Sequence, residues 1–265
     1  MEQLPKKNIL GIEVTDAKRD TVLQYITRSL EDTDESYYIV TPNPEMIVYA
    51  KKNTLFKKIL NQAQIALPDG VGVTVAARVL GNGLKERVSG TDLMETLCAQ
   101  VAKKPITVGF LGGKDRIAEK TAECLIQKYP GLKVVFVAEE WEGLANGRWQ
   151  MANSNESKHE REAISHMPYV ISEIDILFVA FGFPKQELWM AEHVGKIPVR
   201  IMMGVGGAFD YLSGRVPRAP LFLRTIGFEW LFRLIVQPWR WRRQLALISF
   251  FICAGKEFLI RSKEV

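Results

Sequence analysis

The sequence predicts an α/β fold in which helices cover both faces of a mostly parallel sheet. Apolar runs typical of strands alternate along the chain with segments of helical spacing, an order that favours parallel strands joined by crossover helices. Residues 176–180 are apolar at every position, as expected for a strand buried on both faces. The composition changes after Gly214 to Arg, Trp and Pro. We therefore predict a Rossmann-like core of residues 1–212 and a C-terminal helical appendage of residues 213–265.

Six apolar runs are predicted as strands of this sheet, and five segments between them as helices. The strands are expected at residues 37–41, 64–67, 106–111, 134–137, 175–180 and 199–203. The helices are expected at 44–62, 71–80, 90–103, 114–128 and 184–194.

The residue pattern predicts the structure of two further segments. A strand near residues 9–14 is expected to pair at an edge of the sheet. Residues 139–166 hold a long polar run and are expected to form a loop that leads into a helix, either an ordinary surface excursion or a mobile flap.

Composition places the chain among ordinary soluble globular proteins. Of its 265 residues 47% are hydrophobic and 25% charged, which excludes an intrinsically disordered chain. Its three cysteines form no Cys-x-x-Cys pair, and its three histidines do not cluster with them, so neither a zinc site nor a disulfide framework is expected. The polar N-terminus lacks the apolar core of a secretory signal. A reducing, cytoplasmic location fits these features.

Basic charge is concentrated in the appendage. Residues 215–243 contain seven arginines and one glutamate, a net charge of +6 in a chain whose total is +5, together with three of the six tryptophans. The apolar stretch that follows, residues 245–254, is ten residues long and too short to span a bilayer, which takes about 20. Arginine and tryptophan beside a short apolar helix favour an anionic membrane surface. A packed helix or an oligomer contact is the alternative, and no nucleic-acid-binding signature accompanies the segment.

Small and polar residues follow five predicted strands. They occupy positions 41–44, 68–72, 112–115, 181–187 and 204–210. In an open parallel sheet, ligands bind at the carboxyl ends of strands, beside helix N-termini. Glycines there, among them Gly112, Gly113 and Gly206, let backbone N–H groups approach an anion, although a tight strand-to-helix turn also needs glycine for packing.

Three side chains at this edge have a predicted chemical role. Asp69 lies between Pro68 and Gly70, where a carboxylate can act as a general base or merely cap the next helix. Arg87 can bind a phosphate. Gln186 follows Pro184 at a helix start and can hydrogen-bond a ligand, the alternative being an ordinary surface helix start.

Six motifs occur in an order that resembles one family. They are Thr41-Pro42-Asn43, Pro68-Asp69-Gly70, Arg87-Val88-Ser89-Gly90-Thr91-Asp92, Gly182-Phe183-Pro184-Lys185-Gln186-Glu187, Gly204-Val205-Gly206-Gly207 and Glu229-Trp230-Leu231-Phe232-Arg233. The chain is similar in these motifs, over residues 9–245, to the WecG/TagA/CpsF glycosyltransferases (glycosyltransferase family 26). Residues 139–166 depart from the family, which usually has a short Gly-aromatic turn there.

The resemblance implies an inverting, metal-independent transfer that needs no cofactor. A sugar, typically of N-acetylmannosamine type, passes from a UDP-sugar donor to an undecaprenyl-diphosphate-linked saccharide acceptor in the synthesis of cell-surface polysaccharide or teichoic acid. The family implies roles by position: Asp69 as general base, Thr41 and Asn43 at the donor, and pocket or appendage contacts from Arg87, Gln186, Arg233, Arg240 and Arg243.

The implied location is peripheral, on the inner face of the plasma membrane. Two other functions fit the same sheet: a nucleotide-dependent oxidoreductase, which would be expected to have a Gly-x-Gly-x-x-Gly loop that is not found, and a non-enzymatic membrane-surface adaptor. The donor sugar, the acceptor linkage and the oligomeric state stay open at this stage.

Overall fold

The protein folds around a six-stranded parallel sheet. The computed structural model describes residues 3–140 and 173–262, except the side chains of residues 240 and 242–244. The strand order is β4-β3-β8-β7-β5-β6, and every pair is parallel. The strands are β3 (Tyr37–Val40), β4 (Ile65–Ala66), β5 (Thr107–Gly112), β6 (Lys133–Ala138), β7 (Ile174–Ala180) and β8 (Val199–Gly204). All six predicted strands are confirmed, and no end differs from its prediction by more than one residue.

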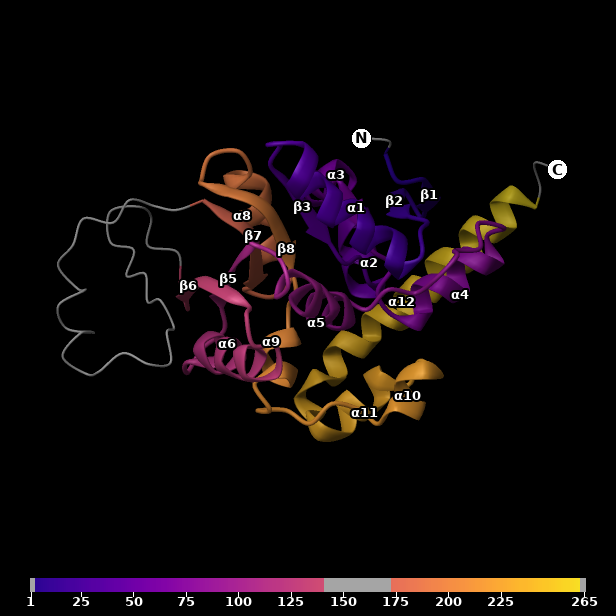
Figure 1. Ribbon diagram of the computed structural model, residues 1–265. Coiled ribbons are helices and arrows are strands. Elements are labelled where there is room, and N and C mark those ends of the chain that lie inside the picture. The colour runs from indigo at the N-terminus through magenta and orange to yellow at the C-terminus, as the bar shows by residue number, and fades with distance from the viewer. Residues whose placement is uncertain (1–2, 141–172, 263–265) are drawn as a thin grey trace, which may run out of the picture.

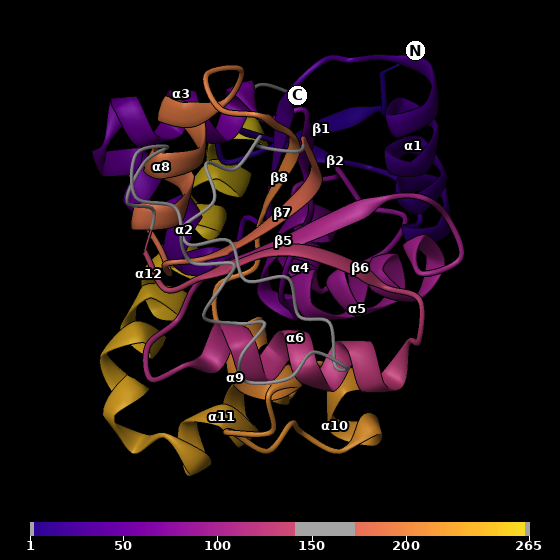
Figure 2. The same ribbon diagram turned by 60° about the vertical axis from the view of Figure 1, so that its left-hand side comes forward.

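Helices cover both faces of this sheet, as predicted (Figures 1 and 2). The alternation of side chains along each strand explains the two layers: Ile39 faces one buried cluster, whereas Tyr38 and Val40 face the other. The first cluster includes residues of α1 (Arg19–Asp32), α5 (Gly90–Val101), α6 (Ile117–Lys128) and α9 (Ala208–Leu212). The second includes residues of α2 (Pro44–Lys52), α3 (Thr54–Gln62), α4 (Val71–Val79), α8 (Lys185–His193) and α12 (Trp241–Arg261).

Two helix predictions need correction. The single helix expected at 44–62 is two helices, α2 and α3, because the backbone of Asn53 is extended and its side chain accepts a hydrogen bond from the Phe56 N–H at 2.9 Å. Helix α1 was not predicted, although Val22, Ile26 and Leu30 recur at the spacing of a buried helix face.

The N-terminal strand prediction was also wrong. Residues 9–14 do not form one edge strand but belong to a hairpin of β1 (Lys6–Ile9) and β2 (Ile12–Thr15), which is a separate two-stranded antiparallel sheet. The turn between them falls at Leu10 and Gly11, both with positive φ, and the Gly11 N–H donates to Asn8 Oδ1 at 2.9 Å. A positive φ is easily adopted by glycine, so the reversal occurs at this position.

The appendage runs over the outside of the core and then joins it. Helices α10 (Leu221–Thr225) and α11 (Glu229–Val236) lie below the sheet in Figure 1, and η2 (Pro238–Arg240) leads into α12. Helix α12 returns beside α2 and α4, where Phe250 and Ala254 are buried in the second core cluster. No helix within the described ranges combines the length and apolar character needed to cross a membrane. The loop expected at 139–166 lies almost wholly outside the described residues.

Candidate active site

The predicted site residues line one edge of the sheet, at the carboxyl ends of the strands. Asp69 follows β4, Thr41 and Asn43 follow β3, Gly206 follows β8, Gln186 follows β7, and Gly112 and Gly113 lie at the end of β5. Strands β3, β8 and β7 separate β4 from β5. At about 4.8 Å per strand, the Asp69 end and the Gly112 end of this edge are roughly 19 Å apart. Asp69 and Thr41 therefore lie on neighbouring strands, whereas the glycines of β5 lie at the far side.

Asp69 sits at the turn from β4 into α4. Its backbone N–H donates to the Pro42 carbonyl at 3.0 Å, which fixes the turn against the end of β3. The next residue, Gly70, has a φ of 88° and occupies the N-cap position of α4, where no side chain makes a capping hydrogen bond. Among the described hydrogen bonds, none joins the Asp69 carboxylate to a backbone N–H of the first turn of α4. This local structure leaves it available at the edge of the sheet.

The pKa of the Asp69 carboxyl is raised to about 6. Burial of this half-buried side chain is the largest cause, and the negative charges of Glu229 and Asp92 act in the same direction. The positive charge of Arg87 and a hydrogen bond from the Gly70 N–H act in the opposite direction. A carboxylate with a pKa near neutrality is well suited to accept a proton during catalysis.

Arg87 connects this part of the core to the appendage. Its Nη2 donates to the carbonyl oxygen of Arg224, at the end of α10, at 2.7 Å. Two residues before the start of α11, Gly227 has a φ of 86°, and a Cβ there would lie 2.7 Å from Cβ of Val71, the first residue of α4. The turn between α10 and α11 therefore packs directly on the segment that holds Asp69.

A cluster of ion pairs lies beside Asp69. Arg218 Nη2 is 2.7 Å and Arg224 Nη1 3.3 Å from Asp92 Oδ1, and Arg218 Nε is 3.4 Å from Glu229 Oε1. Sequence analysis counted these arginines only as membrane-facing charge. The acids that they pair with, one in the first turn of α5 and one at the start of α11, gave no signal in the sequence beyond their place in the motifs.

Arg233 of α11 reaches the same edge at the end of β8. Its guanidinium lies so close to Gly207 that a Cβ there would be 2.4 Å from Nη2, and Nη2 is 3.7 Å from Asp210 Oδ2. The guanidinium also stacks over the Tyr211 ring, with 4.7 Å between Cζ and the ring centroid. Asp210 lies in the segment 204–210 singled out in the sequence, but no separate role was predicted for it. The side chains of Arg240 and Arg243 lie outside the described residues.

Thr41 and Asn43 have structural contacts at the end of β3. Thr41 is buried, and its side chain packs against Gly90, where a Cβ would lie 3.0 Å from Cγ2. Asn43 is the N-cap of α2, because its Oδ1 accepts a hydrogen bond from the Met46 N–H at 3.1 Å. Neither contact tests the predicted donor-binding role, which stays a prediction.

Gln186 joins the loops that follow β7 and β8. Its Oε1 accepts hydrogen bonds from the N–H groups of Gly182, at 3.2 Å, and Gly206, at 3.1 Å. Its Nε2 donates to Glu187 Oε1 at 2.8 Å. Glu187 is fully buried, and this burial raises its pKa to about 7. The structure thus gives Gln186 a definite role in loop geometry, and its predicted ligand contact stays untested.

Close packing explains why glycine occurs at the end of β5. Gly112 has a φ of 108°, and a Cβ there would lie 2.7 Å from the carbonyl carbon of Ala180 on β7. Gly113 has a φ of 78° and lies against Ile117. A larger residue at Gly112 would push the two strands apart, so this glycine is explained with or without a bound phosphate.

The described residues show which charged groups this edge of the sheet offers. Within residues 3–140 and 173–262, no group of three or more His, Cys, Asp or Glu side chains is arranged to hold a metal ion. The charged groups gathered near Asp69 are arginines and the carboxylates that they pair with. Such a site can move a proton through Asp69 and can stabilise negative charge through guanidinium groups.

Comparison with known proteins identifies the family of the chain. The chain is 30% identical over 244 residues, 92% of its length and 88% of the relative's, to an N-acetylglucosaminyldiphosphoundecaprenol N-acetyl-beta-D-mannosaminyltransferase of Bacillus spizizenii. Proteins of the same name from Bacillus subtilis (28% identical, 95% of this chain and 91% of the relative) and Staphylococcus aureus (29%, 93% and 91%) are also similar. The Glycosyl transferase WecG/TagA/CpsF family matches residues 7–264. With Asp69, Arg87 and Gln186 in their expected motifs along one sheet edge, the chain belongs to the WecG/TagA/CpsF family of glycosyltransferases.

Proposed function

We propose that this protein transfers an N-acetylmannosamine-type sugar from a UDP donor to an undecaprenyl-diphosphate-linked N-acetylglucosamine. The observation that carries the proposal is Asp69, a carboxylate with a pKa of about 6 at the carboxyl end of β4, with Arg87 nearby. The acceptor and the transferred sugar are those in the names of the similar proteins. The UDP group is the donor that the family resemblance implies.

In the proposed reaction, Asp69 takes the proton from an acceptor hydroxyl as that oxygen attacks the anomeric carbon. The bond from the anomeric carbon to the diphosphate oxygen breaks on the opposite face, so the configuration inverts and UDP leaves with the electron pair. With a pKa of about 6, Asp69 is deprotonated in roughly nine molecules of ten at pH 7 and is ready to act as a base. General bases contribute about 10²–10⁴-fold to rates.

Arginines are proposed to stabilise the departing diphosphate without a metal ion. Arg87 and Arg233 reach the edge of the sheet from two directions, one from the core and one from the appendage. Fixed guanidinium groups stabilise charge that develops on a leaving group. Arg240 and Arg243 are proposed to complete this set.

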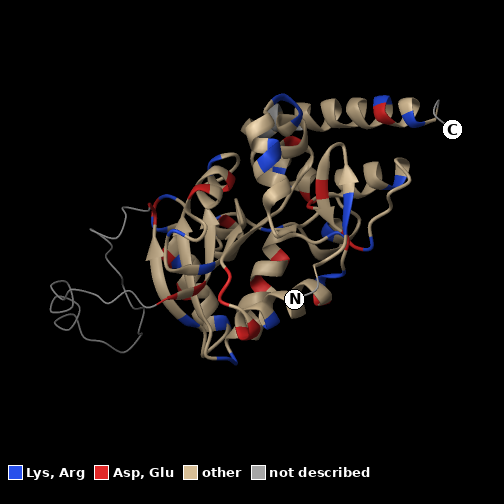
Figure 3. Cartoon of the chain, turned by 90° about the horizontal axis from the view of Figure 1, so that it is seen from above, with Lys and Arg blue, Asp and Glu red and all other residues tan. Residues whose placement is uncertain are grey.

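The protein is proposed to act at the inner face of the plasma membrane as a peripheral protein. The appendage exposes large apolar side chains, including Leu221, Phe222, Ile235, Trp239 and Ile248. In Figure 3 the middle of α12 carries no charged residue, and charged residues occur again near the C-terminus. Exposed apolar side chains beside arginines favour binding at an anionic lipid surface, where the acceptor is held.

The test combines ligand binding with turnover. UDP at about 100 times its Kd adds about 2.7 kcal/mol to stability, which corresponds to roughly 5–10 °C in Tm for a chain of this size. We expect this shift to persist in EDTA, and turnover of UDP-N-acetylmannosamine with a lipid-linked N-acetylglucosaminyl diphosphate to fall about 10²–10⁴-fold in Asp69→Ala. Absence of transfer with this pair of substrates, or full activity of Asp69→Ala, would contradict the proposal.

A further inference from the structure

Arg218 is the centre of the charge cluster next to Asp69. It lies in the segment between α9 and α10, and its guanidinium is only 17% exposed. It contacts three carboxylates: Asp92 at 2.7 Å, Glu229 at 3.4 Å and Glu95 at 3.9 Å. Two of these belong to α5 of the core and one to α11 of the appendage. Arg218 therefore joins the appendage to the core.

Two of these three carboxylates also act electrostatically on Asp69. Asp92 and Glu229 are the two acids whose charges oppose ionisation of the Asp69 carboxyl and raise its pKa, and Arg87 is the cation that favours it. Arg218 is paired with both of those acids, whereas Arg224 is paired with Asp92 alone. The third acid, Glu95, is also paired with Lys128, so it adds little uncompensated charge. Among the described groups, Arg218 is the cation shared by both acids beside Asp69.

We propose that Arg218 is a positioning residue for Asp69, because it neutralises Asp92 and Glu229 and so keeps negative charge from accumulating around the base. The inference rests on the proposed function of Asp69 and adds a residue that acts through it. Arg218 does not touch the reacting atoms in this scheme. It acts by holding α11 against α5 and by balancing the two acids.

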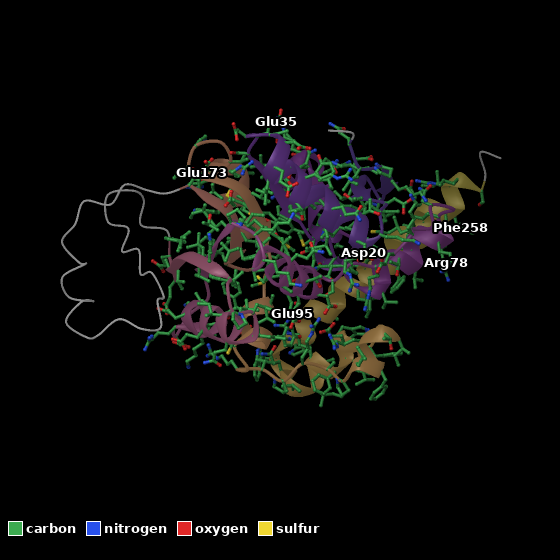
Figure 4. The ribbon with its side chains drawn as sticks, in the orientation of Figure 1. Asp20, Glu35, Arg78, Glu95, Glu173 and Phe258 are labelled. Atoms are coloured by element: carbon green, nitrogen blue, oxygen red, sulfur yellow. The ribbon has the colours of Figure 1, made fainter. Side chains whose placement is uncertain are left out.

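The surroundings of Arg218 can accept a methionine, which is smaller than arginine, because Arg218 lines a cavity. The cavity, of about 390 Å³, is lined by Arg218 and Arg224 from the appendage side and by Glu95, Cys124 and Lys128 from the core. Figure 4 labels Glu95 in the region where α5 approaches the appendage. The cationic side chains of the lining are already paired with carboxylates, so the cavity itself has little net charge. A methionine fits this space.

The experiment measures kcat/KM against pH for the full-length protein and Arg218→Met. Loss of the arginine leaves Asp92 and Glu229 less compensated, which raises the pKa of Asp69 by roughly one unit. The acid limb of the profile should move to higher pH, with a loss of roughly fivefold at pH 6 and less than about twofold at pH 8.5. Arg218→Lys keeps the charge and should restore most of the wild-type profile. Arg215→Met is the matched control, because Arg215 is half exposed and, among the residues that the structure describes, forms an ion pair only with the exposed Asp115.

A second variant keeps the inference testable if Arg218→Met does not fold. Glu229→Gln removes one of the two acids, so the acid limb should move to lower pH than in the wild type. An equal loss of activity at every pH in Arg218→Met, or an unmoved limb in both variants, would overturn the inference. The proposed function is tested separately by Asp69→Asn: if that variant keeps turnover and the acid limb, Asp69 is not the base, whatever Arg218 does.

Discussion

At the scale of single residues, the raised pKa of Asp69 makes the carboxylate a stronger base and lowers the stability of the folded protein. An aspartate in an unfolded chain has a pKa of about 3.9, whereas burial beside Glu229 and Asp92 raises it to about 6 in the folded protein. Between these two values the folded state binds the proton more tightly than the unfolded state, so stability falls as the pH rises through this window. Well above pH 6 the full loss of folding stability is present. This is the expected sign for a catalytic carboxylate held in a site that disfavours its charge.

Asp69→Asn should therefore stabilise the protein at high pH. Asparagine has nearly the same shape and no charge, so we expect a higher Tm than that of the wild type at pH 8 and little difference at pH 4, where the wild-type carboxyl is neutral in the folded protein. Thermal unfolding at the two pH values measures this. Asp115→Asn, at a carboxylate 73% exposed on the surface, is the control and should shift Tm little at either pH. A lower Tm for Asp69→Asn at pH 8 would mean that the carboxylate makes stabilising contacts instead.

The residues of the site differ in how far the sequence could predict them. Asp69 and Arg87 could be singled out because a carboxylate between Pro68 and Gly70 at a strand end is unusual and the motif order is specific. The contacts of Gln186 could not, because they depend on where the loops of Gly182 and Gly206 meet in space. The pairing of Arg218 with α5 is a long-range contact of the same kind.

At the scale of secondary structure elements, two asparagines cap helices with nearly the same geometry. Asn43 Oδ1 accepts from the N–H of Met46 at the start of α2, at 3.1 Å, and Asn53 Oδ1 from the N–H of Phe56 at the start of α3, at 2.9 Å. Replacing an N-cap asparagine with alanine costs about 0.5–2 kcal/mol. Only Asn43 lies at the edge of the sheet that carries Asp69. Comparing substitutions at Asn43 and Asn53 therefore distinguishes an effect of capping from an effect on donor binding.

Asn43→Ala and Asn53→Ala should lower stability by similar amounts, about 1 kcal/mol each. If Asn43 also binds the donor, Asn43→Ala alone should raise the KM for the UDP-sugar, and Asn43→Ser should restore stability without restoring KM, since serine caps well but lacks the amide. Thermal unfolding and steady-state kinetics on the three variants measure both effects. Equal KM values for Asn43→Ala and Asn53→Ala would leave Asn43 with a capping role only.

Elements were predictable where the local pattern was strong. The six strands are continuous or alternating apolar runs bounded by turn residues, and the ends of each were predicted to within one residue. The helix break at Asn53 was missed because the apolar spacing of α2 and α3 continues across it, and only the capping contact reveals the boundary. The hairpin at Gly11 was missed because the segment from Ile9 to Val14 is short, and its apolar run conceals the turn.

At the scale of the whole molecule, α12 serves the core and the surface at the same time. Phe250 and Ala254, four residues apart, are buried against α2 and α4. Leu245, Ile248 and Ile252 lie three and four residues apart on another face and are more than half exposed. Deleting the appendage would remove part of the core together with the exposed surface, so loss of membrane binding after truncation would not identify the surface responsible.

Substitution on the exposed face of α12 separates its packing in the core from its proposed binding to a membrane. Ile248→Ser with Ile252→Ser removes apolar side chains that are 60% and 55% exposed, so Tm should change little. Binding to vesicles with anionic lipid should weaken at least tenfold, because burial of each side chain in the lipid contributes about 1.5–3 kcal/mol. Vesicle co-sedimentation measures the binding. Leu55→Ser, at an exposed leucine of α3, is the matched control and should bind vesicles as the wild type does. Turnover of a lipid-linked acceptor in vesicles should fall with binding, while turnover of a detergent-solubilised acceptor should not, because the proposed site around Asp69 is unchanged. Undiminished vesicle binding by the double variant would show that α12 is not the surface that meets the membrane.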